Sequence, residues 1–284
     1  MDKALSEDET PQFEKISETP AKTLAPNDPS WGIPAAVGLW LLSVFAIMIV
    51  PAVFLLPYVA TRSGSMSNED LLRIATKDPT GIFLQILGLI PAHLITLATA
   101  WFVITRLRQD SFTEALGWKS GGVRWWHYVL IVVGFFALIV AVGQYIPMVE
   151  DELTRIAMSS QAAMIAIAVM AVVTAPITEE VIYRGALYSA FQRRVGPFLS
   201  IIVVTLLFTS VHIPQYAENP SKIILIASLS LVLTLLRASS GNLLPAIILH
   251  TLFNSISAIQ MLLEPYARTL NKPETAAAFL SLFR

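Results

Sequence analysis

Long apolar runs constrain this chain more than any other feature of its sequence. A helix needs about 20 mostly apolar residues to cross a bilayer, and several runs approach or exceed that length. The composition agrees, because 55% of the 284 residues are hydrophobic and only 14% are charged, whereas soluble domains carry about 25% charged residues. The sequence therefore predicts an all-α fold, a polytopic membrane helical bundle.

The apolar runs predict seven to eight transmembrane helices. The eighth is counted only if one kinked run is really two. We expect the fourth span to continue past Pro176 to Arg194, and Pro214 to stop the fifth span. The expected spans cover residues 32–60, 81–105, a run from the aromatic belt at 125–128 to about 147, 161–194, 198–212, 222–237 and 243–263.

Four parts follow along the chain. Residues 1–30 are acidic and proline-containing, which predicts a disordered polar tail rather than a signal peptide. Residues 31–150 hold about three transmembrane helices, 160–264 form a catalytic transmembrane core, and 265–284 are a C-terminal tail. The distribution of Lys and Arg favours a cytoplasmic N-terminus. Short loops and the lack of an organellar leader suggest an integral protein of a bacterial plasma membrane.

Net charge and cysteine content exclude two classes of function. The formal net charge of −1 offers no basic surplus to neutralise phosphates, so we expect no nucleic-acid partner. The chain has no cysteine, which rules out a disulfide framework and a thiolate zinc site.

Three charged residues interrupt the fourth apolar run. Glu179, Glu180 and Arg184 lie within six positions, although each charge in hydrocarbon costs roughly 2.5–3.5 kcal/mol on insertion scales. Glu180 and Arg184 are four residues apart, so they share a helix face and can pair. A sequence that accepts this cost needs these groups, either as part of a site or as a structural clamp.

Two later spans carry polar residues with the same four-residue spacing. Phe208 precedes His212, and His250 precedes Asn254, so each pair shares one helix face. Glu179 and His212 lie at similar heights on the two sides of the turn at 196–197. A carboxylate beside a histidine can deprotonate water, and a second histidine with an amide can stabilise an oxyanion. The arrangement predicts hydrolysis of a peptide bond.

A metal-dependent version uses the same residues. Glu180, His212 and His250 would form a two-histidine, one-carboxylate set of the kind that holds catalytic zinc. The zinc-protease motif HExxH is absent. Spacing alone therefore leaves both a zinc site and a metal-free site open.

Other functions can use the same groups. Buried Glu, His and Arg also mark the ion pathways of transporters and proton relays. Histidine and asparagine also tie helices together in non-catalytic scaffold or immunity proteins. By the same reasoning His93, in the second span beside Pro91, is expected to be a structural hydrogen-bond donor.

The three motifs in this order resemble those of the CPBP family (CAAX protease and bacteriocin-processing, also called Abi) of intramembrane proteases. That family is marked by EExxxR, FxxxH and HxxxN, which stand here at residues 179–184, 208–212 and 250–254. The letters RG that end the first motif and GNLLPAIILH before the third also agree. The resemblance covers roughly residues 160–260.

The resemblance implies endoproteolysis within the bilayer by an all-α core. Glu179 with His212 would activate water, His250 with Asn254 would stabilise the oxyanion, and Glu180 with Arg184 would support the site. Relatives in eukaryotes and archaea trim prenylated CAAX proteins, whereas bacterial members have varied substrates. We therefore expect a membrane-embedded or lipidated protein or peptide as the substrate, and the lipid bilayer as the surroundings.

Overall fold

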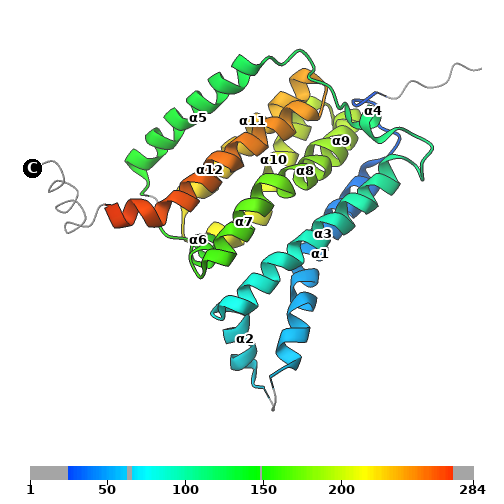
Figure 1. Cartoon of the computed structure of the whole chain (residues 1–284). Coiled ribbons are helices and arrows are strands. Elements are labelled where there is room, and N and C mark those ends of the chain that lie inside the picture. The colour runs from blue at the N-terminus through cyan, green and yellow to red at the C-terminus, as the bar shows by residue number, and fades with distance from the viewer. Residues whose placement is uncertain (1–24, 63–65, 148, 271–284) are drawn as a thin grey trace, which may run out of the picture.

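The computed structural model describes residues 25–62, 66–147 and 149–270, and these residues form an α-helical bundle (Figure 1). Seven helical stretches in this part of the chain are long and apolar enough to cross a membrane, which confirms the predicted fold class. Residues 1–24 and 271–284 of the two predicted tails lie outside the described residues. The elements are α1 (Ile33–Ala60), α2 (Asn68–Thr76), α3 (Pro79–Ile104), α4 (Phe112–Leu116), α5 (Trp125–Tyr145), α6 (Glu152–Ala157), α7 (Gln161–Val173), α8 (Ala175–Glu180), η1 (Val181–Leu187), α9 (Tyr188–Val195), α10 (Pro197–Tyr216), α11 (Pro220–Ser240) and α12 (Leu244–Leu270).

The composite segment α7–α9 lies in the middle of the bundle. It packs against α3 on one side and against α12 on the other. The antiparallel pair α1 and α3 forms one flank in Figure 1, and α5 is the outermost helix beyond α11 and α12. The first polar motif is therefore carried by the segment that touches both halves of the chain.

This composite segment is one span of 35 residues, Gln161–Val195, with two irregular points. Thr174 ends α7 and begins α8, and Pro176 cannot donate a main-chain hydrogen bond there. After Glu180 the helix widens into a π-helical turn, η1, in which all seven side chains are buried. Such π-turns occur often at functional sites. Both irregularities flank the two glutamates.

Helix α10 corrects one sequence prediction. Pro214 was expected to stop this helix, but α10 continues through Pro214 and ends at Tyr216. A proline removes one main-chain donor near the end of a helix, and membrane helices tolerate this where neighbouring groups satisfy the freed carbonyl. The helix therefore extends one turn beyond His212.

The largest buried cluster surrounds η1 and contains residues far apart in the sequence. Trp31 donates its indole N–H to the Ala186 carbonyl, 3.1 Å away. Arg237 donates to Asn27 Oδ1 at 2.9 Å and to the Pro26 carbonyl at 2.8 Å. The segment before α1 is therefore bound both to η1, which carries part of the first motif, and to α11.

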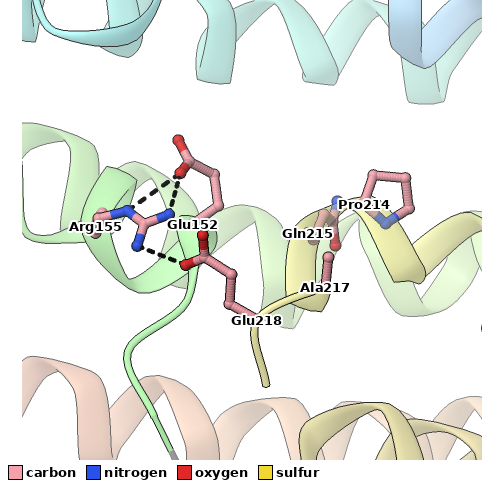
Figure 2. A pocket seen from close by; sticks show the side chains of 6 residues that line it. All are labelled: Glu152, Arg155, Pro214, Gln215, Ala217 and Glu218. Carbon is pink, nitrogen blue, oxygen red and sulfur yellow. Dashed lines mark hydrogen bonds and ion pairs between the residues drawn. The ribbon is translucent and has the colours of Figure 1, made fainter. Parts of the chain in front are cut away.

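An exposed ion-pair cluster joins α6 to the loop after α10 (Figure 2). Arg155 lies 2.6 Å from Glu152 and 3.0 Å from Glu218. Exposed pairs of this kind contribute about 0–1 kcal/mol each. The cluster lines a shallow pocket of about 140 Å³ with Pro214, Gln215 and Ala217.

A buried carboxylate lies close to this cluster and holds the neighbouring loops together. Asp151 Oδ2 lies 2.5 Å from Lys222 Nζ, and Oδ1 accepts hydrogen bonds from the N–H and hydroxyl of Thr154. Burial alone raises the pKa of Asp151, but the hydrogen bonds from Lys222 and Thr154 outweigh burial and hold that pKa below its ordinary value. The carboxylate therefore stabilises the fold in its ionised form.

We expect Asp151→Asn to destabilise the protein by about 1–3 kcal/mol at pH 7, because Lys222 loses its buried acceptor. A carboxyl group with a lowered folded-state pKa stabilises fully above the unfolded-state value, near 4, and loses this effect as the pH falls through the folded-state value. Thermal unfolding in detergent at several pH values measures the difference, which should shrink below about pH 4. The exposed neighbour Glu150 provides the control: Glu150→Gln should unfold like the wild type, and an equal effect of both variants would contradict this account.

Candidate active site

The first motif is built around a fully buried ion pair. Arg184 Nη1 lies 2.8 Å from Glu180 Oε1, and both side chains are 0% exposed. Helix α11 completes the guanidinium's surroundings: Nε donates to Thr234 Oγ1 at 3.2 Å, and Nη2 donates to the carbonyl and hydroxyl oxygens of Ser230 at 2.9 and 2.8 Å. A buried charge is tolerable only when it is paired and hydrogen-bonded in this way.

His250 lies between the two adjacent glutamates. Its Nδ1 is 2.8 Å from Glu180 Oε1, and its Nε2 is 3.8 Å from Glu179 Oε2. Because the Glu180 carboxylate is an acceptor, we assign the hydrogen to Nδ1, and Nε2 then faces Glu179. A carboxylate that fixes the orientation of an imidazole in this way is a recurring part of catalytic sites.

The two glutamates differ in exposure. The side chain of Glu179 is 23% exposed, whereas that of Glu180 is 0% exposed. Adjacent residues on a helix point about 100° apart, so Glu180 turns into the bundle and Glu179 turns toward its edge. Glu179 is therefore the glutamate whose side chain is accessible from outside the bundle interior.

Asn254 lies one helical turn after His250 and binds a different element. Its side-chain amide donates to the main-chain carbonyl of Ala171, in the last turn of α7, at 2.8 Å. One amide hydrogen thus holds α12 against α7, and the second is left for another acceptor. A non-catalytic scaffold protein would also use an interhelical hydrogen bond of this kind.

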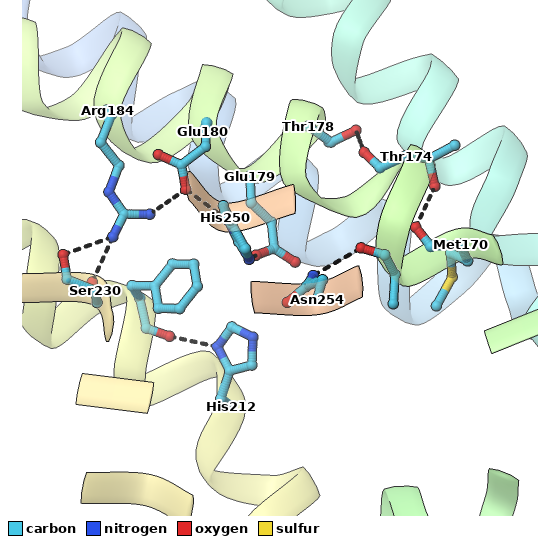
Figure 3. A network of polar contacts seen from close by, with 12 residues as sticks. Met170, Thr174, Thr178, Glu179, Glu180, Arg184, His212, Ser230, His250 and Asn254 are labelled. Atoms are coloured by element: carbon cyan, nitrogen blue, oxygen red, sulfur yellow. Dashed lines mark hydrogen bonds and ion pairs between the residues drawn. The ribbon is translucent and has the colours of Figure 1, made fainter. Parts of the chain in front are cut away.

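His212 faces this group from α10. Its Nδ1 lies 2.7 Å from the Phe208 carbonyl, so Nδ1 donates and Nε2 is left free. In Figure 3 the side chains of Glu179 and His212 point toward each other from opposite sides of the network. No hydrogen bond or ion pair joins His212 to either glutamate in the part of the chain that the structure describes.

Phe208 connects the histidines and the arginine through its ring. Arg184 lies over this ring at 4.7 Å from the centroid, the His212 ring is 4.6 Å away, and His250 packs edge-on at 6.1 Å. The aromatic residue of the second motif therefore fills the centre of the site.

The predicted metal set does not come together in this arrangement. Glu180 Oε2 is buried without a hydrogen-bond partner, but Oε1 is held by Arg184 and His250. Among the described residues, no three His, Asp or Glu side chains converge closely enough to hold a metal ion. Glu180, His212 and His250 as they stand do not fit a zinc site.

The structure thus brings four of the predicted residues together: Arg184 contacts Glu180, Glu180 contacts His250, and His250 lies beside Glu179. His212 and Asn254 lie next to this group (Figure 3). Sequence reasoning missed Ser230 and Thr234, which hold the guanidinium. Their four-residue spacing on an apolar helix is a usable signal, because it presents two hydroxyls to one neighbour. It also missed the π-turn, which leaves no such pattern.

Comparison with known proteins finds that one segment of the chain is similar to a described family. Residues 161–256 match the model of the family described as type II CAAX prenyl endopeptidase Rce1-like. The matched segment contains the three motifs from Glu179 to Asn254, which confirms the resemblance to the CPBP proteases over this segment. No curated protein and no solved structure matches the chain. The seven apolar helices indicate an integral membrane protein, and residues 161–256 of it are similar to this endopeptidase family.

Removing one partner of the buried ion pair should cost more than removing both charges. We expect Arg184→Ala to destabilise the protein by about 3–5 kcal/mol, because it leaves the Glu180 charge buried and unpaired. Replacing both charges in Glu180→Gln/Arg184→Met should restore most of the stability, since Gln still accepts from His250. Thermal unfolding in detergent compares the variants, and a double variant as unstable as Arg184→Ala would contradict the pairing.

Proposed function

Residues 161–256 form an Rce1-like protease segment, and we propose that this chain is a glutamate-type intramembrane endopeptidase. The observation that carries the proposal is the position of His250 between a buried glutamate and an accessible one. That arrangement separates an orienting carboxylate, Glu180, from a reacting carboxylate, Glu179. A helix clamp alone needs only the buried one.

Glu179 is the general base of the proposed reaction. It takes a proton from a water molecule, whose oxygen then attacks the carbonyl carbon of the scissile peptide bond. His250 Nε2, 3.8 Å from Glu179, is near enough to relay that proton to the leaving amine as the C–N bond breaks. Hydrogen bonds of this kind are often long before the substrate binds.

The remaining motif residues surround the reacting atoms. The tetrahedral intermediate carries a negative oxygen, and the second amide hydrogen of Asn254 is a donor for it. His212 presents its free Nε2 from the opposite side, where it can hold the attacking water. Glu180 and Arg184 touch neither water nor substrate and orient His250.

The substrate reaches this site from the lipid. A cavity of about 400 Å³ between α3 and α7 is lined almost entirely by apolar side chains, such as Phe83, Ile90 and Val169, and extends to Thr174. Thr174 lies five residues before Glu179. An apolar cavity beside the site favours a membrane-embedded or lipidated peptide as the substrate class, in agreement with the prenylated substrates in the family's description.

We expect Glu179→Gln to reduce cleavage by about 10²–10⁴-fold without lowering the melting temperature, because the amide keeps the shape of the side chain but cannot accept the proton. The purified protein in proteoliposomes is assayed by mass spectrometry. The two probes are a farnesylated peptide with a C-terminal CaaX sequence and the same peptide with a free cysteine. Preference for the farnesylated peptide supports a lipidated substrate.

Cleavage by Glu179→Gln at the wild-type rate would remove the catalytic assignment. Comparing peptide fragments in membranes of cells that carry the wild type or Glu179→Gln extends the test to native substrates. A cellular phenotype that survives in Glu179→Gln would instead indicate a scaffold, and ion flux across the same proteoliposomes would indicate a transporter.

The metal-free mechanism makes its own prediction. Treatment with 1,10-phenanthroline should leave the cleavage rate unchanged, because the described residues place no three ligands together. Loss of activity that returns on addition of zinc would show that the side chains rearrange to bind a metal. Metal analysis of the purified protein is the matching control.

A further inference from the structure

A histidine outside the family segment contacts the catalytic helix. His93 is buried on α3, and its Nδ1 lies 2.9 Å from Thr174 Oγ1. The Thr174 hydroxyl lies 3.3 Å from the Met170 carbonyl, to which it donates, so it accepts the hydrogen bond from His93. We therefore assign the hydrogen to His93 Nδ1, and its partner is the residue where α7 and α8 meet.

Thr174 is the point from which the direction of α8 is set. Its carbonyl accepts hydrogen bonds from the N–H of Thr178 at 3.1 Å and from the hydroxyl of Thr178 at 2.9 Å. We call the irregular point at Thr174–Pro176 the α7–α8 break: Pro176 has no N–H to donate there, and α8 has six residues before the π-turn. Between these two irregular points the helix lacks part of its regular main-chain hydrogen bonding, so side-chain contacts at Thr174 help to set the direction of the residues that follow.

Two different helices hold the break from opposite sides. His93 on α3 binds Thr174, and Asn254 on α12 binds Ala171 one turn earlier. Figure 3 draws the bonds made by Asn254, Thr174 and Thr178 close to Glu179.

We propose that His93 is a positioning residue for Glu179. By donating from Nδ1 to Thr174, it fixes the α7–α8 break and thereby holds the Glu179 carboxylate facing His250. The inference rests on the proposed function only in naming Glu179 as the reacting carboxylate. The contact itself can be tested without any substrate.

The test compares replacements that keep or remove the Nδ1 donor. His93→Asn places an amide N–H close to the position of Nδ1, whereas His93→Leu removes the donor and keeps an apolar side chain. Thr96→Val is the matched control, because Thr96 is also buried on α3 and its hydroxyl donates to the Ala92 carbonyl of its own helix. Thr174→Val and Thr174→Ser probe the same bond from the acceptor side.

The first measurement is hydrogen–deuterium exchange of residues 175–187 in the folded protein, followed by mass spectrometry. We expect faster exchange in this segment for His93→Leu and Thr174→Val, with little change elsewhere, because the break opens locally. His93→Asn, Thr174→Ser and Thr96→Val should exchange like the wild type. A purely structural role of His93 would instead raise exchange throughout the bundle.

The second measurement is the kinetics of cleavage of the farnesylated CaaX peptide. His93→Leu should lower kcat by about 10–100-fold, the size expected for a misplaced catalytic group, with KM near the wild-type value. His93→Asn should restore most of kcat. The double variant His93→Leu/Thr174→Val should be no slower than either single variant, since both break the same bond.

The outcomes separate this inference from the proposed function. Wild-type exchange at 175–187 in both His93→Leu and Thr174→Val overturns the inference, whether or not the peptide is cleaved. Equal loss of kcat in His93→Asn and His93→Leu also overturns it. If the wild type does not cleave the peptide, the proposed activity on that substrate fails, and the exchange measurement still decides the role of His93. If His93→Leu does not fold, Thr174→Val removes the same bond with a side chain of the same shape.

Discussion

The buried ion pair between Glu180 and Arg184 is the interaction on which the rest of the site depends. Two charges with no exposure to solvent can exist in a membrane-spanning bundle only if their hydrogen-bonding groups are satisfied, because desolvation otherwise exceeds the Coulomb gain. Ser230 and Thr234 from α11 and His250 from α12 meet this demand except at Glu180 Oε2, which has no hydrogen-bond partner among the described residues. Pairing the charges therefore brings three helices to one place, and the orientation of His250 is a consequence of it.

The two neighbouring glutamates have opposite surroundings for a geometric reason. On a regular helix adjacent side chains diverge by about 100°, so a pair of glutamates cannot both face the same buried cation. Glu180 takes the buried position and Glu179 remains partly exposed. His250 joins them because its two ring nitrogens lie on opposite edges of the imidazole. One short sequence thus provides a buried carboxylate that orients His250 and a partly exposed one beside it.

Much of this could be predicted from the sequence, and the rest could not, for physical reasons. The apolar runs located all seven spans, because hydrocarbon thickness sets their length. The four-residue spacings placed Glu180 with Arg184 and His250 with Asn254 on common faces, because helical geometry is local. The acceptor of Asn254 depends on which helix packs beside it, and the extension of α10 through Pro214 depends on groups that compensate for one missing donor. Neither leaves a local pattern.

Some hydrogen bonds that support the site come from residues outside the segment that matches the protease family. Residues 161–256 contain the motifs, yet the Thr174 side chain, between α7 and α8, is bonded to His93 on α3, and a carbonyl of the π-turn is bonded to Trp31, just before α1. Both contacts are made where the helix is irregular and therefore less constrained by its own hydrogen bonds. Irregular backbone inside a membrane needs partners from neighbouring elements. Here those partners come from α3 and from the residue just before α1, so the N-terminal part of the chain supplies hydrogen bonds to the segment that carries the first motif as well as apolar surface.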